Sequence, residues 1–238
     1  MSSLRAEDLS KARAALEHDD YSTAQNIADE ACQQTPDNPE AWIVLGHALS
    51  GQIDHASVFK KADLAKRTLA AYLHAAKLAP KNTEVHTSLL EYYRQAPALV
   101  GGSRSKAYAE ARVLIDLDAG LGFAWTARLA GEDHRTEEAF RACEHLLEIE
   151  PKTYRALYWF GATSAMAGRD LERGEDALRR ALLLVPGEDD PGLDEANVQL
   201  GNLLIQKGDK AGAIRAYNTA LTINAHSEEA KAGLSRLK

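Results

Sequence analysis

The chain has 238 residues, of which 45% are hydrophobic and 26% charged, and its formal net charge is −7. This composition excludes an intrinsically disordered protein and is typical of one or two folded domains. The acidic balance argues against a nucleic-acid partner, since proteins that bind nucleic acids need a cationic surface for the phosphates.

The N-terminal segment MSSLRAEDLSKARAALEHDD has neither the apolar core nor the small-residue cleavage site of a secretory signal. No apolar run approaches the roughly 18 residues of a membrane span, so we expect no membrane insertion. The two cysteines, Cys32 and Cys143, are too far apart for a disulfide framework or a zinc knuckle. We therefore expect a reducing cytoplasmic location, although an exported protein trimmed of its signal would present the same sequence.

Similar segments recur along the chain, each with a large apolar residue directly before a glycine. They are EAWIVLGHAL (40–49), RALYWFGATSAMAG (155–168) and EANVQLGNLLIQKG (195–208), with the pairs Leu45-Gly46, Phe160-Gly161 and Leu200-Gly201. The last segment ends at a second glycine, Gly208, and Ala213, Tyr217 and Ala220 then follow at helical spacing. Such self-similarity is the mark of a repeat architecture.

A proline or its substitute closes each segment, at Pro36, Pro80, Ala119, Pro151, Pro186 and Ala225. Six residues after the first four of these stand Trp42, His86, Trp125 and Leu157, and Asn197 follows the fifth after an insertion. This pattern resembles the tetratricopeptide repeat family, in a bacterial-type form with many repeats. The signature of that family is a 34-residue helix–turn–helix with Trp, Leu-Gly, an aromatic residue, Ala, Phe or Tyr, Ala and a final Pro.

The resemblance covers nearly the whole chain and implies an all-α fold, a right-handed superhelical solenoid of stacked helix pairs. We expect one domain, 1–238, with a closing helix at 228–238. Its six repeats are expected at 5–38, 39–82, 83–121, 122–153, 154–193 and 194–227. Small residues such as Gly46, Gly161 and Gly201 should allow close approach within a pair, while Tyr72, Leu178 and Tyr217 fill the grooves.

Three repeats depart from the common length. The second carries an insertion, SGQIDHASVFKK, which we expect to extend its second helix at the N-terminal end. The fourth is about two residues short near AGEDHRTEE, which predicts a short first helix. The fifth carries an acidic insertion, GEDDPGLDE, interpreted as a solvated loop rather than a docking site.

The stretch APALVGGSRSKA, within the third repeat, could be interpreted as a phosphate loop or a Ser-x-x-Lys nucleophile. A phosphate loop needs a preceding strand and a Gly-Lys-Ser/Thr ending, and neither is present. A hydrolase built on Ser103 and Lys106 needs companion motifs that are also missing. We therefore predict a turn between two helices, in which the glycines supply unusual backbone angles and Ser103 or Ser105 caps the second helix.

No other cluster predicts a metal, a cofactor or a catalytic pair. Cys143 and His145 lie about 200° apart around a helix, so they cannot chelate one ion. The carboxylates of Glu137, Glu138, Glu144 and Glu148 are typical of a solvated helix face. We expect no cofactor, no metal site and no enzyme activity.

In the family that the chain resembles, the first helices line a concave groove that holds the partner. The positions just after the tryptophan site and one turn further on then imply a partner-binding set. Its members are Ile43, Val44, His47, Thr87, Ser88, Glu91, Arg94, Thr126, Tyr158, Trp159, Ala162, Val198, Gln199 and Asn202.

Tyr158 and Trp159 precede the core residue Phe160, and adjacent large residues should not all face one buried seam. We therefore expect Trp159 or Tyr158 to be presented to the groove as an aromatic anchor. The alternative is packing against the first helix of a neighbouring repeat. The two-carboxylate clamp with which chaperone co-factors of this family hold an acidic tail is not evident, since the first repeat has Leu9 and Arg13 at the corresponding positions and the last has Val198 and Asn202.

The resemblance implies a non-enzymatic scaffold that binds a peptide, a helix or a protein surface in this groove. An alternative is a self-associating structural protein, a homo-oligomer, in which the short closing helix leaves apolar surface for another copy. A hydrolase and a helical-repeat RNA reader are two further alternatives, against which the missing motifs and the acidic balance argue. The sequence does not name the partner.

Overall fold

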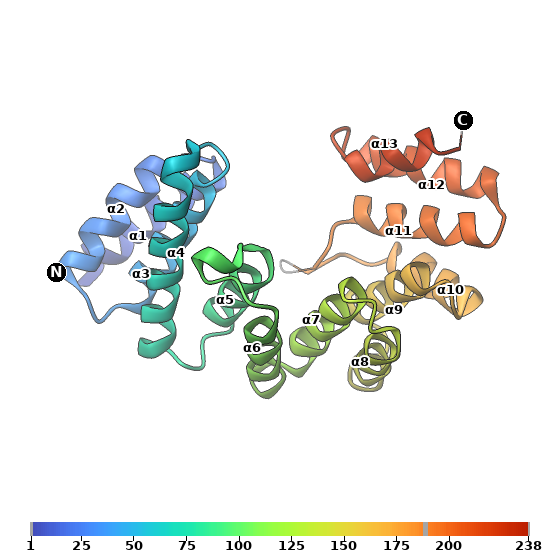
Figure 1. Ribbon diagram of the computed structural model, residues 1–238, viewed down its shortest axis with the longest axis horizontal. Coiled ribbons are helices and arrows are strands. Elements are labelled where there is room, and N and C mark those ends of the chain that lie inside the picture. Colours follow the sequence, from blue (N-terminus) through green and yellow to red (C-terminus); the bar gives the residue numbers. More distant parts are fainter. Residues whose placement is uncertain (1, 188–189, 238) are drawn as a thin grey trace. The chain divides into compact units, whose positions relative to one another are not determined.

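The computed structural model describes residues 2–187 and 190–237, with side chains from Asp8 onward. Within these ranges the chain is entirely helical, with thirteen α-helices and one short 3₁₀ helix, η1 (Figure 1). The helices are α1 (Ser2–Glu17), α2 (Tyr21–Gln34), α3 (Pro39–Gln52), α4 (Val58–Leu78), α5 (Thr83–Gln95), η1 (Ala98–Val100), α6 (Arg104–Leu117), α7 (Ala119–Glu132), α8 (Thr136–Ile149), α9 (Tyr154–Ala167), α10 (Leu171–Ala181), α11 (Leu193–Gln206), α12 (Lys210–Ile223) and α13 (Glu228–Ser235).

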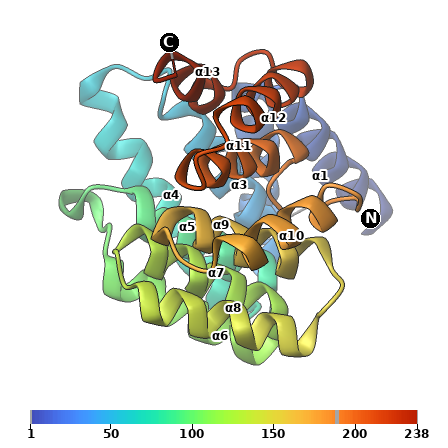
Figure 2. The same cartoon turned by 90° about the vertical axis from the view of Figure 1, so that its right-hand side faces the viewer.

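The chain forms two compact units, Met1–Leu117 and Asp118–Lys238, called unit 1 and unit 2 below. Consecutive helices pack as pairs: α1 with α2, α3 with α4 and α5 with α6 in unit 1, and α7 with α8, α9 with α10 and α11 with α12 in unit 2. The first helices also pack on one another, as α1 on α3 and α9 on both α7 and α11. In unit 2, α11, α12 and α13 lie side by side (Figures 1 and 2).

Several helices begin where the sequence supplies a capping side chain. Asn38 directly precedes Pro39, the first residue of α3. Its side chain accepts a hydrogen bond from the Glu40 amide. Asn82 does the same for α5, and Asp118 for α7. A side-chain oxygen at this position satisfies an amide that has no partner within the helix, and proline is tolerated there because it lacks that amide. These local signals fix the residue at which the first helix of each of these repeats begins.

At three glycines of the repeats, a large side chain of the paired helix packs directly against the glycine backbone. A Cβ atom added to Gly46 would lie 2.2 Å from the Tyr72 ring, and one on Gly201 would lie 2.5 Å from the Tyr217 ring. One on Gly161 would lie 2.3 Å from Leu178. The packing expected from the glycine pattern is confirmed at all three, because any larger residue would push the helix pair apart.

The six-residue step from proline to tryptophan reflects a hydrogen bond. The Trp42 indole N–H donates to the Pro36 carbonyl at 2.9 Å, and the His86 Nε2 lies 3.1 Å from the Pro80 carbonyl. A carbonyl in the turn after one helix is thereby bonded from the next helix. His86 therefore stands at the tryptophan position because its ring makes the same contact.

The irregular repeats differ from expectation in one case. The insertion of the second repeat does lengthen α4, which has 21 residues where the other second helices have 11 to 14. The prediction of a short first helix in the fourth repeat is wrong, because α7 has 14 residues. The missing residues are removed from the connection instead: only Asp118 separates α6 from α7, and it caps α7 itself.

The stretch APALVGGSRSKA forms a turn, as predicted. Its glycines are required sterically, since Gly101 has a φ of 103° and a Cβ on Gly102 would lie 1.7 Å from the Ala96 carbonyl oxygen. The Ser103 hydroxyl accepts from the Lys106 amide at the start of α6. The Lys106 ammonium lies over the Tyr93 ring, 5.1 Å from its centre.

Candidate functional site

The structure divides the fourteen residues of the partner-binding set into two groups. Half of them are buried: Ile43, Val44, Ser88, Tyr158, Trp159, Ala162 and Val198. Of these, Ser88 still lines a cavity described below. The other half are partly exposed: His47, Thr87, Glu91, Arg94, Thr126, Gln199 and Asn202. Sequence position alone therefore does not decide which first-helix residues reach the surface.

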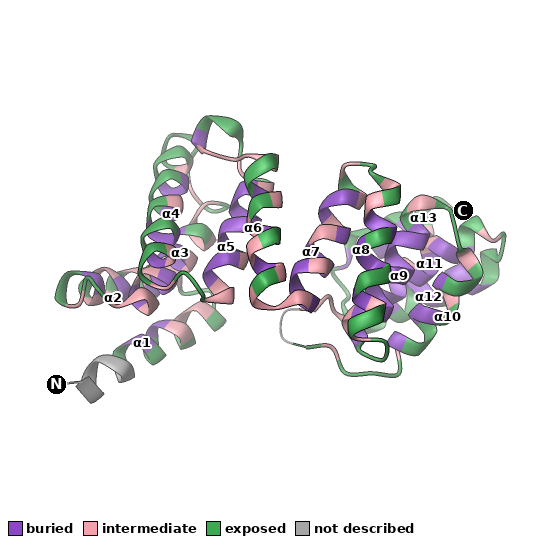
Figure 3. Ribbon diagram, turned by 90° about the horizontal axis from the view of Figure 1, so that it is seen from below, coloured by how far each residue is buried: buried purple, intermediate pink, exposed green. Residues whose placement is uncertain are grey.

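The aromatic pair of α9 is buried on both sides. Tyr158 is 4% exposed and Trp159 is 9% exposed, and their rings meet edge to face. Tyr158 also stacks on Tyr154, and the Arg128 guanidinium of α7 lies 6.0 Å from the centre of the Trp159 ring. Helix α9 packs against α7, α8, α10 and α11, so most of its surface is core (Figure 3). A helix surrounded in this way accommodates large residues at consecutive positions, and the structure places neither ring as an open anchor.

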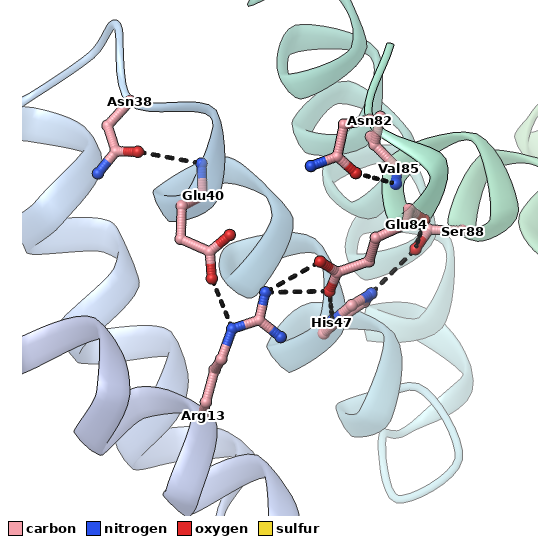
Figure 4. Close-up of polar contacts among 8 residues, drawn as sticks. All are labelled: Arg13, Asn38, Glu40, His47, Asn82, Glu84, Val85 and Ser88. Carbon is pink, nitrogen blue, oxygen red and sulfur yellow. Dashed lines mark hydrogen bonds and ion pairs between the residues drawn. The ribbon is translucent and has the colours of Figure 1, made fainter. Parts of the chain in front are cut away.

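In unit 1 a polar network joins the three first helices, α1, α3 and α5, whose shared surface we call the first-helix face (Figure 4). Arg13 of α1 donates to Glu40 of α3 at 2.5 Å and to both carboxylate oxygens of Glu84 of α5 at 3.0 Å. These hydrogen bonds raise the pKa of Arg13, that to Glu40 most. All three side chains are more than a third exposed, so each ion pair contributes at most about 1 kcal/mol.

His47 of α3 extends the network toward the C-terminal ends of α3 and α5. Its Nε2 lies 2.9 Å from the Ser88 hydroxyl, which donates to the Glu84 carbonyl, and its Nδ1 lies 3.8 Å from the Glu84 carboxylate. Because the Ser88 proton is already used, the network assigns the His47 proton to Nε2. Burial, followed by the nearby charge of Arg13, lowers the pKa of His47 to about 4.

A cavity of about 420 Å³ opens between α3 and α5 beyond His47, and we call it the α3–α5 cavity. It gathers three members of the predicted set, His47, Ser88 and Glu91, around Tyr72 of α4. Burial and then Glu91 raise the pKa of Tyr72, so its hydroxyl stays protonated. The Tyr72 ring also meets the His47 ring edge to face, 5.6 Å away between centres.

A second cavity, of about 380 Å³, lies in unit 2. It contains two predicted residues, Gln199 and Asn202 of α11, together with Met166 and Arg236. The Asn202 carbonyl oxygen already accepts from the Tyr217 hydroxyl at 2.8 Å. The polar groups that line this second cavity are thus partly hydrogen-bonded within unit 2.

Three contributors to the first-helix face were missing from the predicted set: Arg13, Glu40 and Glu84. The repeat register carried a signal for two of them, since Glu40 and Glu84 each stand two residues before the tryptophan position. Among the described residues, no group of three or more His, Cys, Asp or Glu side chains could hold a metal ion. In the same part of the chain, no helix combines the length and apolar character needed to cross a membrane.

The acidic insertion of the fifth repeat is not wholly solvated. The Asp190 carboxylate is 7% exposed and accepts from Arg155 of α9 at 2.7 Å and from the Gly187 amide at 3.0 Å. The Tyr154 hydroxyl donates to the Gly192 carbonyl. This loop is held against α9 by its own charges; Glu188 and Asp189 lie outside the described residues.

Comparison with known proteins gives one family match. The model of a family described as tetratricopeptide repeat matches residues 5–48, which contain most of α1, all of α2 and most of α3. No curated protein matches the chain.

The chain is similar in structure to PilW, described as a widely conserved type IV pilus biogenesis factor. The TM-score is 0.67 at 12% identity, over 97% of this chain and 98% of that chain. It is also similar to the Cut9–Hcn1 hetero-tetramer of the APC/C, with a TM-score of 0.69 at 17% identity over 98% of this chain and 42% of that one. For pilF of Pseudomonas aeruginosa the TM-score is 0.66 at 10% identity, over 99% and 98% of the two chains. At these identities the similarity shows the fold alone.

Proposed function

We propose that this chain, a tetratricopeptide repeat protein, is a non-enzymatic module that binds another protein on the first-helix face of unit 1. The observation that carries the proposal is the α3–α5 cavity, where a preformed hollow brings together His47, Ser88 and Glu91 from two helices. Preformed concave sites with a few converging polar groups are typical of binding sites. A fold narrows function only to a class, so the site rather than the fold supports this assignment.

The rigidity of the site supports binding without rearrangement. The Arg13 network ties α1, α3 and α5 together, and the Gly46–Tyr72 contact fixes α4 beneath them. A surface that is already ordered loses little conformational entropy when a partner binds.

The proposal is tested by filling the cavity. Ser50 is exposed on α3 and lines the cavity, so Ser50→Trp should block it. Ser105→Trp on α6, also at an exposed serine of unit 1, is the matched control. With the full chain as bait in lysate of its source organism, we expect a protein retained by the wild type and the control and lost from Ser50→Trp. Retention by all three baits would contradict the proposal, provided that circular dichroism shows each variant folded.

Self-association is a second candidate, supported by exposed apolar side chains. Phe59 at the start of α4 is 94% exposed, and Leu183 and Val185 after α10 are 84% and 90% exposed. Self-association through a weakly covered last repeat has less support, because α13 buries Ala230 and Gly233 against that repeat. Light scattering over a range of concentrations would reveal self-association as a rise in mass.

A further inference from the structure

The α3–α5 cavity is lined by acidic rather than basic side chains. Glu91 of α5 and Asp54, which follows α3, both contribute carboxylates. Among the described residues that line it, none is lysine or arginine, and the one histidine, His47, is neutral at pH 7 because its pKa is lowered to about 4. The cavity therefore holds two negative charges and no positive one.

The ends of two helices add to this negative potential. Helix α3 ends at Gln52 and α5 at Gln95, and the cavity is lined by Ser50 and Gly51 from the last turn of α3 and by Gln95 itself. The C-terminal end of a helix carries a partial negative charge from its unsatisfied carbonyls. Two such ends at one cavity favour a cationic group, as do the carboxylates.

The positive charge of Arg13, which acts on His47, is already compensated. Arg13 is paired with both Glu40 and Glu84, so the network as a whole carries one net negative charge. Tyr72 supplies an aromatic ring at the cavity, and aromatic faces attract ammonium and guanidinium groups. The chain also carries a net charge of −7, which favours encounter with a basic partner.

We propose that the α3–α5 cavity receives an arginine or lysine side chain of the protein partner, with Glu91 and Asp54 as the carboxylates that pair with it. This inference rests on the proposed function and specifies the chemistry of its partner. The volume of about 420 Å³ accommodates one such side chain with some of its backbone. Carboxylates bind guanidinium through charge-assisted hydrogen bonds, which makes arginine the better occupant.

The test uses the full chain and small probes. N-acetyl-arginine methylamide is titrated into labelled protein while the NMR signals of the Ser50 and Gly51 amides are followed. The matched neutral probe is N-acetyl-citrulline methylamide, which keeps the shape and loses the charge. We expect saturable shifts with the arginine probe, with a Kd on the order of 1–10 mM for so small a ligand. The citrulline probe should shift these signals at least tenfold less.

Variants assign the binding to the carboxylates. Glu91→Gln and Asp54→Asn should each weaken the arginine probe about tenfold, whereas Asp116→Asn, at an exposed position of α6, should leave its affinity unchanged. The inference is overturned if citrulline binds equally well, if Glu91→Gln has no effect, or if the shifts do not saturate. Spermidine binding tenfold more tightly than the arginine probe would also overturn it, because the occupant would then be a free polyamine.

The same data separate this inference from the proposed function. If Ser50→Trp loses its protein partner but the arginine probe does not bind, the cavity binds a partner of other chemistry and only this inference fails. If the probe binds but Ser50→Trp retains every partner, the cation site stands as a site for basic side chains while the proposed interaction surface fails.

Discussion

His47 is largely enclosed by other side chains and also takes part in a polar network. Its side chain is 30% exposed, and its ring contacts Tyr72 on one side and Ser88 on another. Protonation would place a cation in a largely desolvated position beside Arg13, which lowers the pKa to about 4. The folded state therefore holds His47 in its neutral form, and protonation of this ring at low pH destabilises the fold.

This predicts a specific acid sensitivity. In the unfolded chain the pKa of His47 returns to about 6.5, so between pH 6.5 and 4 the unfolded state binds the proton that the folded state resists. The free energy of unfolding should fall in this window by roughly 1–2 kcal/mol more in the wild type than in His47→Gln. Urea denaturation at pH 7 and 4.5 measures this difference. His145→Gln, at an exposed histidine, is the control, and parallel pH profiles for wild type and His47→Gln would contradict the prediction.

Gly46 is the second residue with a sharp expectation. Gly46→Ala places a methyl group against the Tyr72 ring and should lower the free energy of unfolding by about 1–3 kcal/mol, although alanine favours helix. Ser50→Ala, one turn further along α3 at an exposed position, should change it by no more than about 0.5 kcal/mol. Chemical denaturation of both variants compares the two values, and equal stability would show that the helix pair can separate at low cost.

At the scale of elements, connections decide as much as helices. The loop before α11 is held by Asp190, whose partner Arg155 lies on α9 with a side chain 17% exposed. Removing one member of a buried pair leaves the other charge without compensation, which is far more damaging than the loss of a surface pair. A loop that looks like an acidic solvated segment can therefore contribute to stability.

We expect Asp190→Ala to lower the free energy of unfolding by about 3 kcal/mol. Asp176→Ala removes the exposed pair with Arg180 and should lower the free energy of unfolding by only about 0.5 kcal/mol. The double variant Arg155→Met/Asp190→Ala should recover part of the loss, because no buried charge is then left alone. Equal losses for Asp190→Ala and Asp176→Ala would show that the loop does not depend on this pair.

Helix α13 closes the last helix pair. Its Gly233 lies so near the Tyr217 ring that an added Cβ would be 2.5 Å away, and Ala230 is fully buried. A chain ending at His226 should expose this surface, melt at a lower temperature and gain mass with concentration. Calorimetry and light scattering test this, with Arg236→Ala at an exposed position as the control. A truncated chain that stays monomeric and equally stable would show that α13 contributes neither to stability nor to keeping the chain monomeric.

At the scale of the whole molecule, the division after Leu117 has a consequence for folding. Each unit has its own buried residues, with Leu9, Val44 and Leu49 in unit 1 and Phe140, Phe160 and Leu203 in unit 2. In repeat proteins stability is built from units and the interfaces between neighbours, so a part with complete pairs can fold alone. Fragments 1–117 and 118–238 should each be helical and unfold cooperatively by circular dichroism. A fragment without a cooperative transition would mean that its core depends on the other unit.

The repeat register made much of the fold predictable. The Leu-Gly pairs, the capping residues Asn38 and Asn82 and the turn at Gly101 all follow from rules that act over a few residues. The candidate site was predictable only in part: His47, Ser88 and Glu91 do line one cavity, while Trp159 lies in the core. Arg13 could not be paired from the sequence, because Glu84, its partner, is 71 residues away.

The sequence by itself determined the order of the helix pairs and which residues meet within a pair, because capping side chains, close approach at glycines and helix-ending prolines are local effects. The tertiary structure alone decided burial across pairs. Tyr158 and Trp159 are covered because α9 has four helical neighbours, and Glu91 lines a cavity together with residues of α3 and with Tyr72 of α4. Burial and electrostatic potential depend on every neighbour packed around a group, and these neighbours come from distant parts of the chain.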